Sequence, residues 1–361
     1  MIFNRETVMA MLALVGPVLL QAFASSAPRP EPGCSTKNGK LLCQNVTRLP
    51  KPLPDGVHFL HVTDSRLDRL GEEELRSDTV STVWFERNAI GELGEGAFRR
   101  LSGLTFLHLS ENLIRADLTW CTFLGLDELT NLHLEDNQIN MESYYDFLEF
   151  DNGTSVVLSR GYFCRCEGIN SSSERSPCEE LTVLPKLQVL SLNCNPVRIL
   201  PGDIFVPLRL SPVAFLYLET CQLLYIDEGS LSPLQHLQIL ILKDNKELVM
   251  DNLAQATTNI DSKYNISLDL SRTDLSEVPT NVLAPIASTL LELLLAENAF
   301  TTVRNGSFPR LPVLERLDLS RCRIRTIEGG AFDGLSNLEF LDLTGNGLTE
   351  VSDVDYLGAT A

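Results

Sequence analysis

Residues 104–114 read LTFLHLSENLI, and this stretch decides the fold because its pattern returns about every 24 residues. Aliphatic residues stand at positions 1, 4, 6 and 11 of the pattern, and an asparagine stands at position 9. Eleven clear copies begin at residues 57, 80, 104, 129, 187, 213, 237, 265, 290, 314 and 338. A repeat of roughly 20–29 residues with this core predicts a stack of similar units rather than separate globular domains.

The repeat has a physical interpretation. Leucines at positions 4 and 6 alternate with polar residues, which predicts a short strand with one buried face. The asparagine amide can satisfy backbone groups that a tight bend leaves unpaired. Cys221 and Cys322 replace it in two copies and are predicted to be buried, unpaired thiols. Because no unit can bury its leucines alone, the pattern predicts an α/β repeat solenoid. Its concave parallel sheet would have about 12 strands, and its convex side would be irregular and helix-poor.

The gap between the copies at residues 129 and 187 is too long for one unit. A degenerate copy from Gly153, with Val156, Leu158, Gly161 and Phe163 in pattern positions, would divide it. This interpretation makes about a dozen units and an insertion around residues 140–182.

The N-terminal residues 1–24 resemble a secretory signal. Arg5 precedes the apolar stretch MAMLALVGPVLL, and Ala22-Phe23-Ala24 offers a cleavage site. An uncleaved anchor is the alternative, but the run is short and Pro17 interrupts it. Residues 25–56 are then predicted to cap a solenoid that covers residues 57–361.

The C-terminal end shows no cysteine-rich cap and no run of ~20 apolar residues. End repeats of a solenoid need a polar cover. Three interpretations stay open: a truncated form of a longer receptor, a last turn that acts as a minimal cap, or an end covered by a partner. The last would allow self-association.

Cysteines and glycosylation motifs favour an extracellular protein. The nine cysteines are an odd number, so at least one thiol has no intrachain partner. One disulfide is predicted among Cys164, Cys166 and Cys178, while Cys121 and Cys194 stay unassigned. N-x-S/T motifs predict glycosylation at Asn45, Asn152, Asn170, Asn265 and Asn305.

Positions 3, 5 and 7 of each copy are expected to point away from the core. Position 5 changes from aromatic and imidazole side chains in the N-terminal copies to carboxylates in the C-terminal ones. Exposed aromatic residues on a rigid sheet are typical anchors for a protein ligand. The alternative is that these aromatic residues have no binding role, because some residue must occupy each exposed position. The candidate ligand-binding residues are Phe59, His61, Trp84, Glu86, Phe106, His108, His133, Glu135, Phe215 and Tyr217.

His108 and His133, with Glu86, Glu111 and Glu135 nearby, have side chains that can bind zinc. Neighbouring histidines on an exposed sheet are more often solvated, so the sequence predicts no metal site and no cofactor. A further interpretation is that these histidines make a contact that depends on pH.

Charge and motifs exclude several functions. The formal charge of −19 repels phosphate backbones, so nucleic acid is not a predicted partner. A cationic protein partner, or simple solubility, is the expected consequence. No H-E-x-x-H, G-x-S-x-G or phosphate-binding loop occurs, so the chain is not predicted to be an enzyme.

The full unit, with second halves such as IGELGEGAFRRL and IRTIEGGAFDGL, resembles the extracellular leucine-rich-repeat family. Members include Toll-type receptor ectodomains, Slit-like guidance proteins and the acid-labile-subunit type. The resemblance covers residues 34–361 and implies a leucine-rich-repeat horseshoe. The cap segment LLCQNVTRLPKPLPDGVHFLHV resembles the family's N-terminal cap, which usually carries four cysteines. Only Cys34 and Cys43 are present here, and their position implies that they pair.

The resemblance implies a secreted module that binds a protein or microbial ligand on its concave face, in innate immunity or cell-surface recognition. A matrix or adhesion assembly protein is the alternative, as is a fragment of a receptor. A carbohydrate-directed enzyme would need a catalytic carboxylate that the sequence does not identify.

Overall fold

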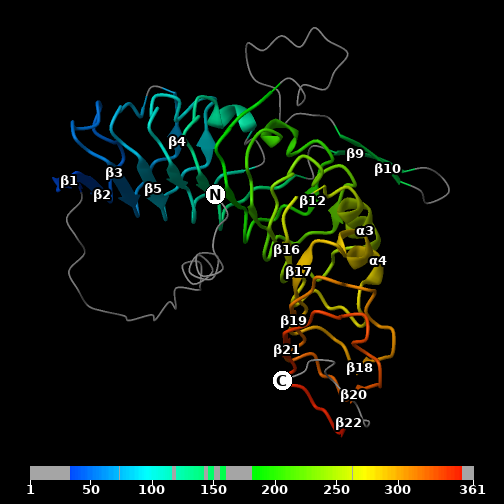
Figure 1. The fold of residues 1–361 in the computed structure, drawn as a ribbon. Coiled ribbons are helices and arrows are strands. Elements are labelled where there is room, and N and C mark those ends of the chain that lie inside the picture. The colour runs from blue at the N-terminus through cyan, green and yellow to red at the C-terminus, as the bar shows by residue number, and fades with distance from the viewer. Residues whose placement is uncertain are drawn as a thin grey trace. The chain divides into compact units, whose positions relative to one another are not determined.

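The computed structural model describes residues 33–351 apart from 73, 116–118, 142–144, 150–154, 160–180 and 262. The predicted signal, Asn152, Asn170 and the cysteines at 164, 166 and 178 therefore lie outside the described residues. Thirteen strands form one sheet, in which every neighbouring pair is parallel except the first (Figure 1). In spatial order they are β1 (Gly33–Lys37), β2 (Lys40–Gln44), β3 (Phe59–Thr63), β5 (Thr82–Glu86), β7 (Phe106–His108), β8 (Asn131–His133), β11 (Val189–Ser191), β13 (Phe215–Tyr217), β15 (Ile239–Ile241), β16 (Ile266–Asp269), β17 (Leu290–Leu294), β19 (Arg316–Asp318) and β21 (Phe340–Asp342).

The eleven clear copies each contribute one strand to this sheet, which confirms the predicted solenoid. The pattern leucines fill its interior. Leu60, Leu107 and Leu317, all at position 4, are fully buried. The two remaining strands, β1 and β2, form an antiparallel hairpin, and β2 pairs with β3. A disulfide joins Cys34 to Cys43 across this hairpin. The hairpin thus continues the sheet at the place where the cap was expected.

The predicted twelfth copy at Gly153 is wrong. β8 pairs directly with β11, so no strand of the sheet comes from the residues between them. Val156 and Leu158 lie instead in β10 (Ser155–Ser159), which pairs antiparallel with β9 (Tyr145–Glu149) in a separate sheet. The physical reason is visible in the residues: this segment has glycine at positions 1 and 9. Glycine supplies neither the buried leucine nor the amide that joins one unit to the next.

A ladder of position-9 side chains connects consecutive units. The Asn137 amide donates to Leu109 O at 2.9 Å in the preceding unit and accepts from Ile114 N at 3.0 Å. Where cysteine replaces asparagine, the thiols of Cys221 and Cys322 donate to the corresponding carbonyl of the preceding unit, each at 3.1 Å. Both thiols are buried and free, as predicted. The asparagines of the ladder are Asn88, Asn112, Asn137, Asn195, Asn245, Asn298 and Asn346.

The residue before each ladder position has left-handed backbone. Position 8 has φ between 49° and 58° in ten copies, and Gly345 has φ 71° in the last. L-residues other than glycine pay about 1–2 kcal/mol for this conformation. Thr220, at φ 56°, is β-branched and so is the least suited of them. The bend turns the chain out of the strand and presents the position-9 amide to the preceding unit.

The side of the solenoid opposite the sheet contains few helices, as predicted. It holds the 3-10 turns at Trp120–Phe123, Val206–Leu208 and Ala284–Ile286, and the short helices α3 (Met250–Thr258) and α4 (Thr280–Leu283) (Figure 1). Helix α3 lies between the copies that begin at residues 237 and 265, which are spaced more widely than the usual 24 residues. Its Leu253 and Ala256 are fully buried, which explains why that unit carries extra residues. The short strands of this side are β4 (Arg69–Leu70), β6 (Glu92–Leu93), β12 (Ile199–Leu200), β14 (Tyr225–Ile226), β18 (Thr302–Val303), β20 (Thr326–Ile327) and β22 (Glu350–Val351).

No helix among the described residues is both long and apolar enough to cross a bilayer.

Candidate functional site

Six aromatic side chains form one continuous group on the outer face of the sheet, the face that carries positions 3, 5 and 7. We call this group the aromatic row. Strand pleating explains it, because the residues between its members, such as Leu60, Val83 and Leu107, point into the core. Register brings the members together, since His61 pairs with Trp84, Trp84 with His108, and His108 with His133. The aromatic row consists of Phe59, His61, Trp84, Phe106, His108 and His133, from β3, β5, β7 and β8.

The rings of the aromatic row contact one another across all four strands. Trp84 stacks on His108 with ring centroids 4.6 Å apart, and Phe106 stacks on His133 at 5.0 Å. Phe59 meets Trp84 at 6.3 Å. All six side chains are half-buried, so each keeps one side in contact with solvent. The result is a preordered apolar surface that loses little side-chain entropy when a ligand covers it.

Carboxylates border the aromatic row. Glu135 hydrogen-bonds to His133 Nδ1 at 2.8 Å and accepts from the Ser110 hydroxyl. Burial raises the pKa of Glu135, but the hydrogen bonds and the charge of His133 outweigh it and lower the pKa to about 2. Glu86 lies 3.6 Å from His61 Nε2 and pairs with Arg87. Glu135 is therefore ionised at neutral pH.

Two neighbouring groups have pKa values that burial shifts. Burial lowers the pKa of His108, and the positive charge that His133 can carry acts in the same direction. Burial also raises the pKa of Glu111, although Arg87 opposes the shift. His108 is therefore a neutral imidazole at neutral pH.

Phe215 and Tyr217 were predicted to share this face, but their side chains are only 5% and 7% exposed. Their strand, β13, lies between β11 and β15, and Phe215 stands in register with Val189 and Ile239. Tyr217 stands in register with Ser191 and Ile241. The two residues therefore offer almost no surface to a ligand.

The carboxylates at position 5 in the C-terminal half have a local structural role that the sequence analysis missed. Asp269, Asp318 and Asp342 each accept a hydrogen bond at 2.8 Å from the backbone N–H two residues later. They hold the chain as it leaves the strand, so their spacing alone does not indicate an acidic binding surface.

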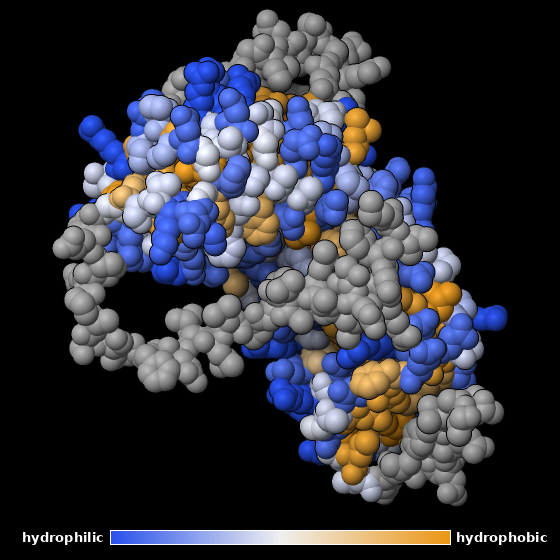
Figure 2. Space-filling model, turned by 60° about the vertical axis from the view of Figure 1, so that its left-hand side comes forward, coloured by the Kyte–Doolittle hydropathy of each residue, from blue (hydrophilic) through white to orange (hydrophobic). Residues whose placement is uncertain are grey.

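The C-terminal end of the same face carries one aromatic contact. The Arg316 guanidinium lies 4.6 Å above the Phe340 ring, and its Nε is 3.0 Å from Glu292. Phe340 is 46% exposed. Figure 2 shows apolar side chains gathered toward the lower end of the molecule, where β19 to β22 lie. Phe340 and Leu348 are the exposed members there.

Three of the glycosylation candidates fall within the described residues, and all three are exposed: Asn45, Asn265 and Asn305. Asn265 occupies a position that usually buries a leucine. The register shifts between Ile266 and Ser267, so that Ile266 pairs with Leu290 and takes over the buried place. This irregularity leaves Asn265 outside the core.

The remaining cysteines differ in environment. Cys194 is exposed and free, and burial together with the charge of Asp136 raises its pKa to about 11. Burial raises the pKa of Cys221 to about 12 and that of Cys322 to about 11. Cys121, which the sequence left unassigned, is disulfide-bonded.

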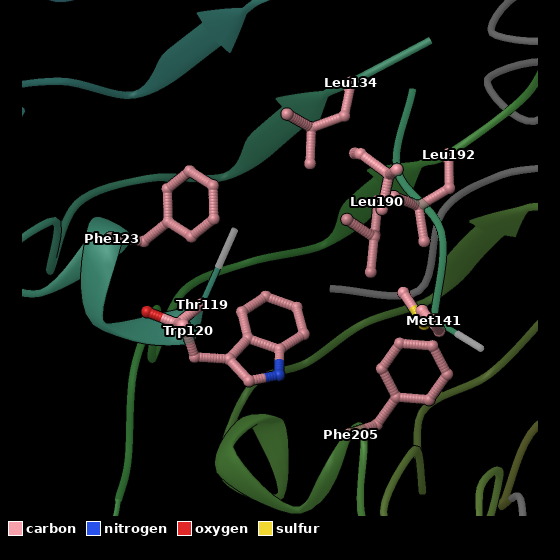
Figure 3. Close-up of a pocket in the computed structure, with 9 residues that line it drawn as sticks. Thr119, Trp120, Phe123, Leu134, Met141, Leu190, Leu192 and Phe205 are labelled. Atoms are coloured by element: carbon pink, nitrogen blue, oxygen red, sulfur yellow. The ribbon is translucent and has the colours of Figure 1, made fainter. Parts of the chain in front are cut away.

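A small internal cavity of about 20 Å³ lies between the sheet and the opposite side. Figure 3 shows Trp120 and Phe205 on one side of it and Leu134, Leu190 and Leu192 on the other. Its walls are apolar, because the Trp120 indole N–H already donates to Ile204 O at 2.6 Å. A cavity of this size holds about one water, so it is a packing defect and not a ligand site.

Comparison with known proteins agrees with the repeat geometry. The family model described as leucine rich repeat matches residues 82–139 and 288–348. Toll-like receptor 3 of Boselaphus tragocamelus is 28% identical over 271 residues, which cover 72% of this chain and 28% of that protein. Tsukushi of Gallus gallus is 26% identical, with 75% of this chain and 76% of Tsukushi covered. Lumican of Rattus norvegicus is 25% identical, with 77% and 80% covered.

The chain thus spans less than a third of the first of these relatives and about three quarters of Tsukushi. Among solved structures, a chain of the octameric complex of Latrophilin 3, Unc5D and FLRT2 has a TM-score of 0.59 and 21% identity. The similarity covers 87% of this chain and 84% of that one. At this level of identity the match concerns the fold alone.

Proposed function

Because this chain is an extracellular-type leucine-rich-repeat protein, we propose that it is a non-enzymatic binding module that recognises a protein ligand with its aromatic row. The observation that carries the proposal is the row itself. Stacked, half-exposed rings on four adjacent strands offer a rigid apolar surface, which is the usual anchor of a protein interface.

The borders of the row support the same function. Glu86 and Glu135 add negative charge beside the rings, which favours a ligand with basic side chains at the rim of the contact. Phosphate backbones would be repelled by the same charge and by the net charge of −19. The proposed ligand is therefore a protein, from the host or from a microbe, and not a nucleic acid.

The proposed setting is extracellular. The predicted secretory signal at residues 1–24, the five glycosylation motifs and the Cys34–Cys43 disulfide all favour it. A role in innate immunity or cell-surface recognition is the finer part of the proposal, supported by the similarity to Toll-like receptor 3.

The test compares the secreted chain with two double variants. Trp84→Ala with His108→Ala removes the two stacked pairs of Trp84 and three further ring contacts. The matched control, Arg316→Ala with Phe340→Ala, removes a ring contact from β19 and β21 on the same face. Each protein is immobilised, incubated with extracellular fluid, and the retained proteins are quantified by mass spectrometry.

We expect at least one protein that wild type and control retain equally and that the Trp84 and His108 variant retains about tenfold less. The same retained proteins in the same amounts on all three would place ligand binding elsewhere.

A second candidate is assembly through the C-terminal end, where Phe340 and Leu348 are exposed (Figure 2). Sedimentation velocity over a range of concentrations tests it. Self-association that Phe340→Asp abolishes favours assembly, whereas a monomer at all concentrations excludes it.

A further inference from the structure

Two imidazoles of the aromatic row have the spacing of a shared metal ion. His108 and His133 pair in register on β7 and β8, and their ring centroids are 5.7 Å apart. Two imidazoles that bind one zinc at about 2.0–2.1 Å with tetrahedral angles have centroids roughly 5 Å apart. The sheet therefore places the rings almost as the ion requires, and the strands need not move.

Glu135 supplies a third ligand from the same place. It lies two residues after His133, just past the end of β8, and its carboxylate is 2.8 Å from His133 Nδ1. One ligand atom from each of His108, His133 and Glu135 lies within 4.8 Å of the other two. Ligand atoms in a tetrahedral zinc shell are roughly 3.3 Å apart, so small side-chain rotations close the site.

The surrounding contacts already hold these side chains. Trp84 stacks on His108, Phe106 stacks on His133, and Ser110 donates to Glu135. Ordered ligands lose less conformational entropy when the ion binds. The Ser110 hydroxyl would continue to hold one carboxylate oxygen while the other turns to the metal, which is the usual role of a residue behind a metal ligand.

We propose that His108, His133 and Glu135 form a zinc site on the outer face of the sheet, with its fourth position open. Two imidazoles and a carboxylate are typical zinc ligands, whereas calcium and magnesium prefer oxygen ligands alone. Three protein ligands leave a position for water or for a side chain of a bound protein. The site goes beyond the proposed function, because it binds the ion whether or not a protein ligand is present.

Cys194 and Asp136 are alternative metal ligands. They follow β11 and β8 and hydrogen-bond to each other. A free thiol binds zinc strongly, so the test must separate it from the imidazoles.

The experiment is calorimetric titration of zinc chloride into the chelator-treated secreted chain, all in a Cys194→Ser background. We expect one zinc to bind per chain. His108→Ala and His133→Ala should each weaken binding about tenfold or more, in line with the loss of one metal ligand. The control is His236→Ala, since His236 contacts Tyr264 in another part of the protein.

Cobalt provides a second measurement. Tetrahedral Co²⁺ gives intense visible bands, and these should appear in the chain and disappear in His108→Gln, which keeps the size of the side chain. Circular dichroism verifies that each variant is folded.

No zinc binding in the Cys194→Ser chain, or equal binding in the His108→Ala variant, overturns the proposal. Weaker binding only in His236→Ala would do so as well. Protein retention measured in chelator is independent of these outcomes, so failure of the zinc site and failure of the proposed function can be told apart.

Discussion

Replacement of Asn195 by alanine tests the ladder that joins consecutive units. Asn195 is completely buried, in the unit that packs directly against the unit of β8 although 58 residues separate the two in sequence. Its amide donates to Leu134 O at 2.8 Å and to Leu192 O at 3.0 Å. Its carbonyl oxygen accepts from Ile139 N at 3.1 Å.

Alanine removes these three bonds and a fourth one, to Asn193 O at 3.2 Å. Leu134 O keeps the Asn137 amide and Leu192 O keeps the Cys221 thiol, so it is the N–H of Ile139 that is left buried without a partner. Each net hydrogen bond is worth about 1 kcal/mol, and an unsatisfied buried group costs about 1–3 kcal/mol. Water can enter the space of the lost amide and reduce this cost. We therefore expect the free energy of unfolding to fall by about 2–4 kcal/mol.

Cysteine at this position should cost less. The thiol of Cys221 donates to Leu192 O in the equivalent geometry, so Asn195→Cys keeps the bond to Leu134 O. We expect it to lose about 1 kcal/mol less than alanine does.

Urea unfolding, monitored by tryptophan fluorescence and by circular dichroism, measures both variants. The two signals must change together if a single free energy is to be extracted. A loss below about 1 kcal/mol for alanine, or an equal loss for cysteine, would refute the proposed role of the ladder.

Three further predictions concern single side chains. Leu319→Ala should lower the free energy of unfolding, measured by urea titration, by about 2–5 kcal/mol, because Leu319 is fully buried. Leu210→Ala, on the surface, should change it by less than about 0.5 kcal/mol. Thr220→Gly should raise it by about 0.5–1 kcal/mol, since relief of the left-handed backbone outweighs the entropy of glycine; a loss would contradict the strain. Cys194, with its pKa raised from 9.0 to about 11, should react with a thiol reagent at pH 8 about a hundredfold more slowly than an unperturbed thiol. Its rate should rise about tenfold per pH unit, measured against Cys194→Ser, and a flat profile would exclude the thiolate as the reactive form.

The fold could be predicted because the residues that each unit needs for stacking stand in its own sequence. Asn137 and Asn195 have to reach the preceding unit, and leucine has to fill positions 1, 4 and 6, so the eleven strands follow from the spacing. Cys221 and Cys322 were predictable for the same reason, since a small donor fits the ladder. The copy at Gly153 failed on this criterion, because the pattern was matched on valine and leucine while the ladder residue was missing.

Exposure on the outer face was harder to predict, because it depends on neighbouring strands. Phe215 stands at the same pattern position as Phe106, yet it is covered where Phe106 is half-exposed. Asp318 reads as a surface charge but bonds to the backbone of Ser320. Such differences arise from residues that are distant in sequence, so the pattern of one unit cannot reveal them.

The independence of the two faces is the strongest argument that the aromatic row has a function. The ladder and the leucines satisfy the backbone and the core without any help from positions 3 and 5 of β3 to β8. Ring stacking contributes about 0.5–1.5 kcal/mol per pair, so a purely structural role for the row is the competing explanation. The two double variants separate these explanations, because both act on the same face: Trp84→Ala with His108→Ala removes five ring contacts, and the control removes the contact of Arg316 with Phe340. If the two variants lose similar amounts of stability but unequal amounts of protein retention, the row serves recognition. If the Trp84 and His108 variant loses much more stability while its retention stays intact, the row has a structural role.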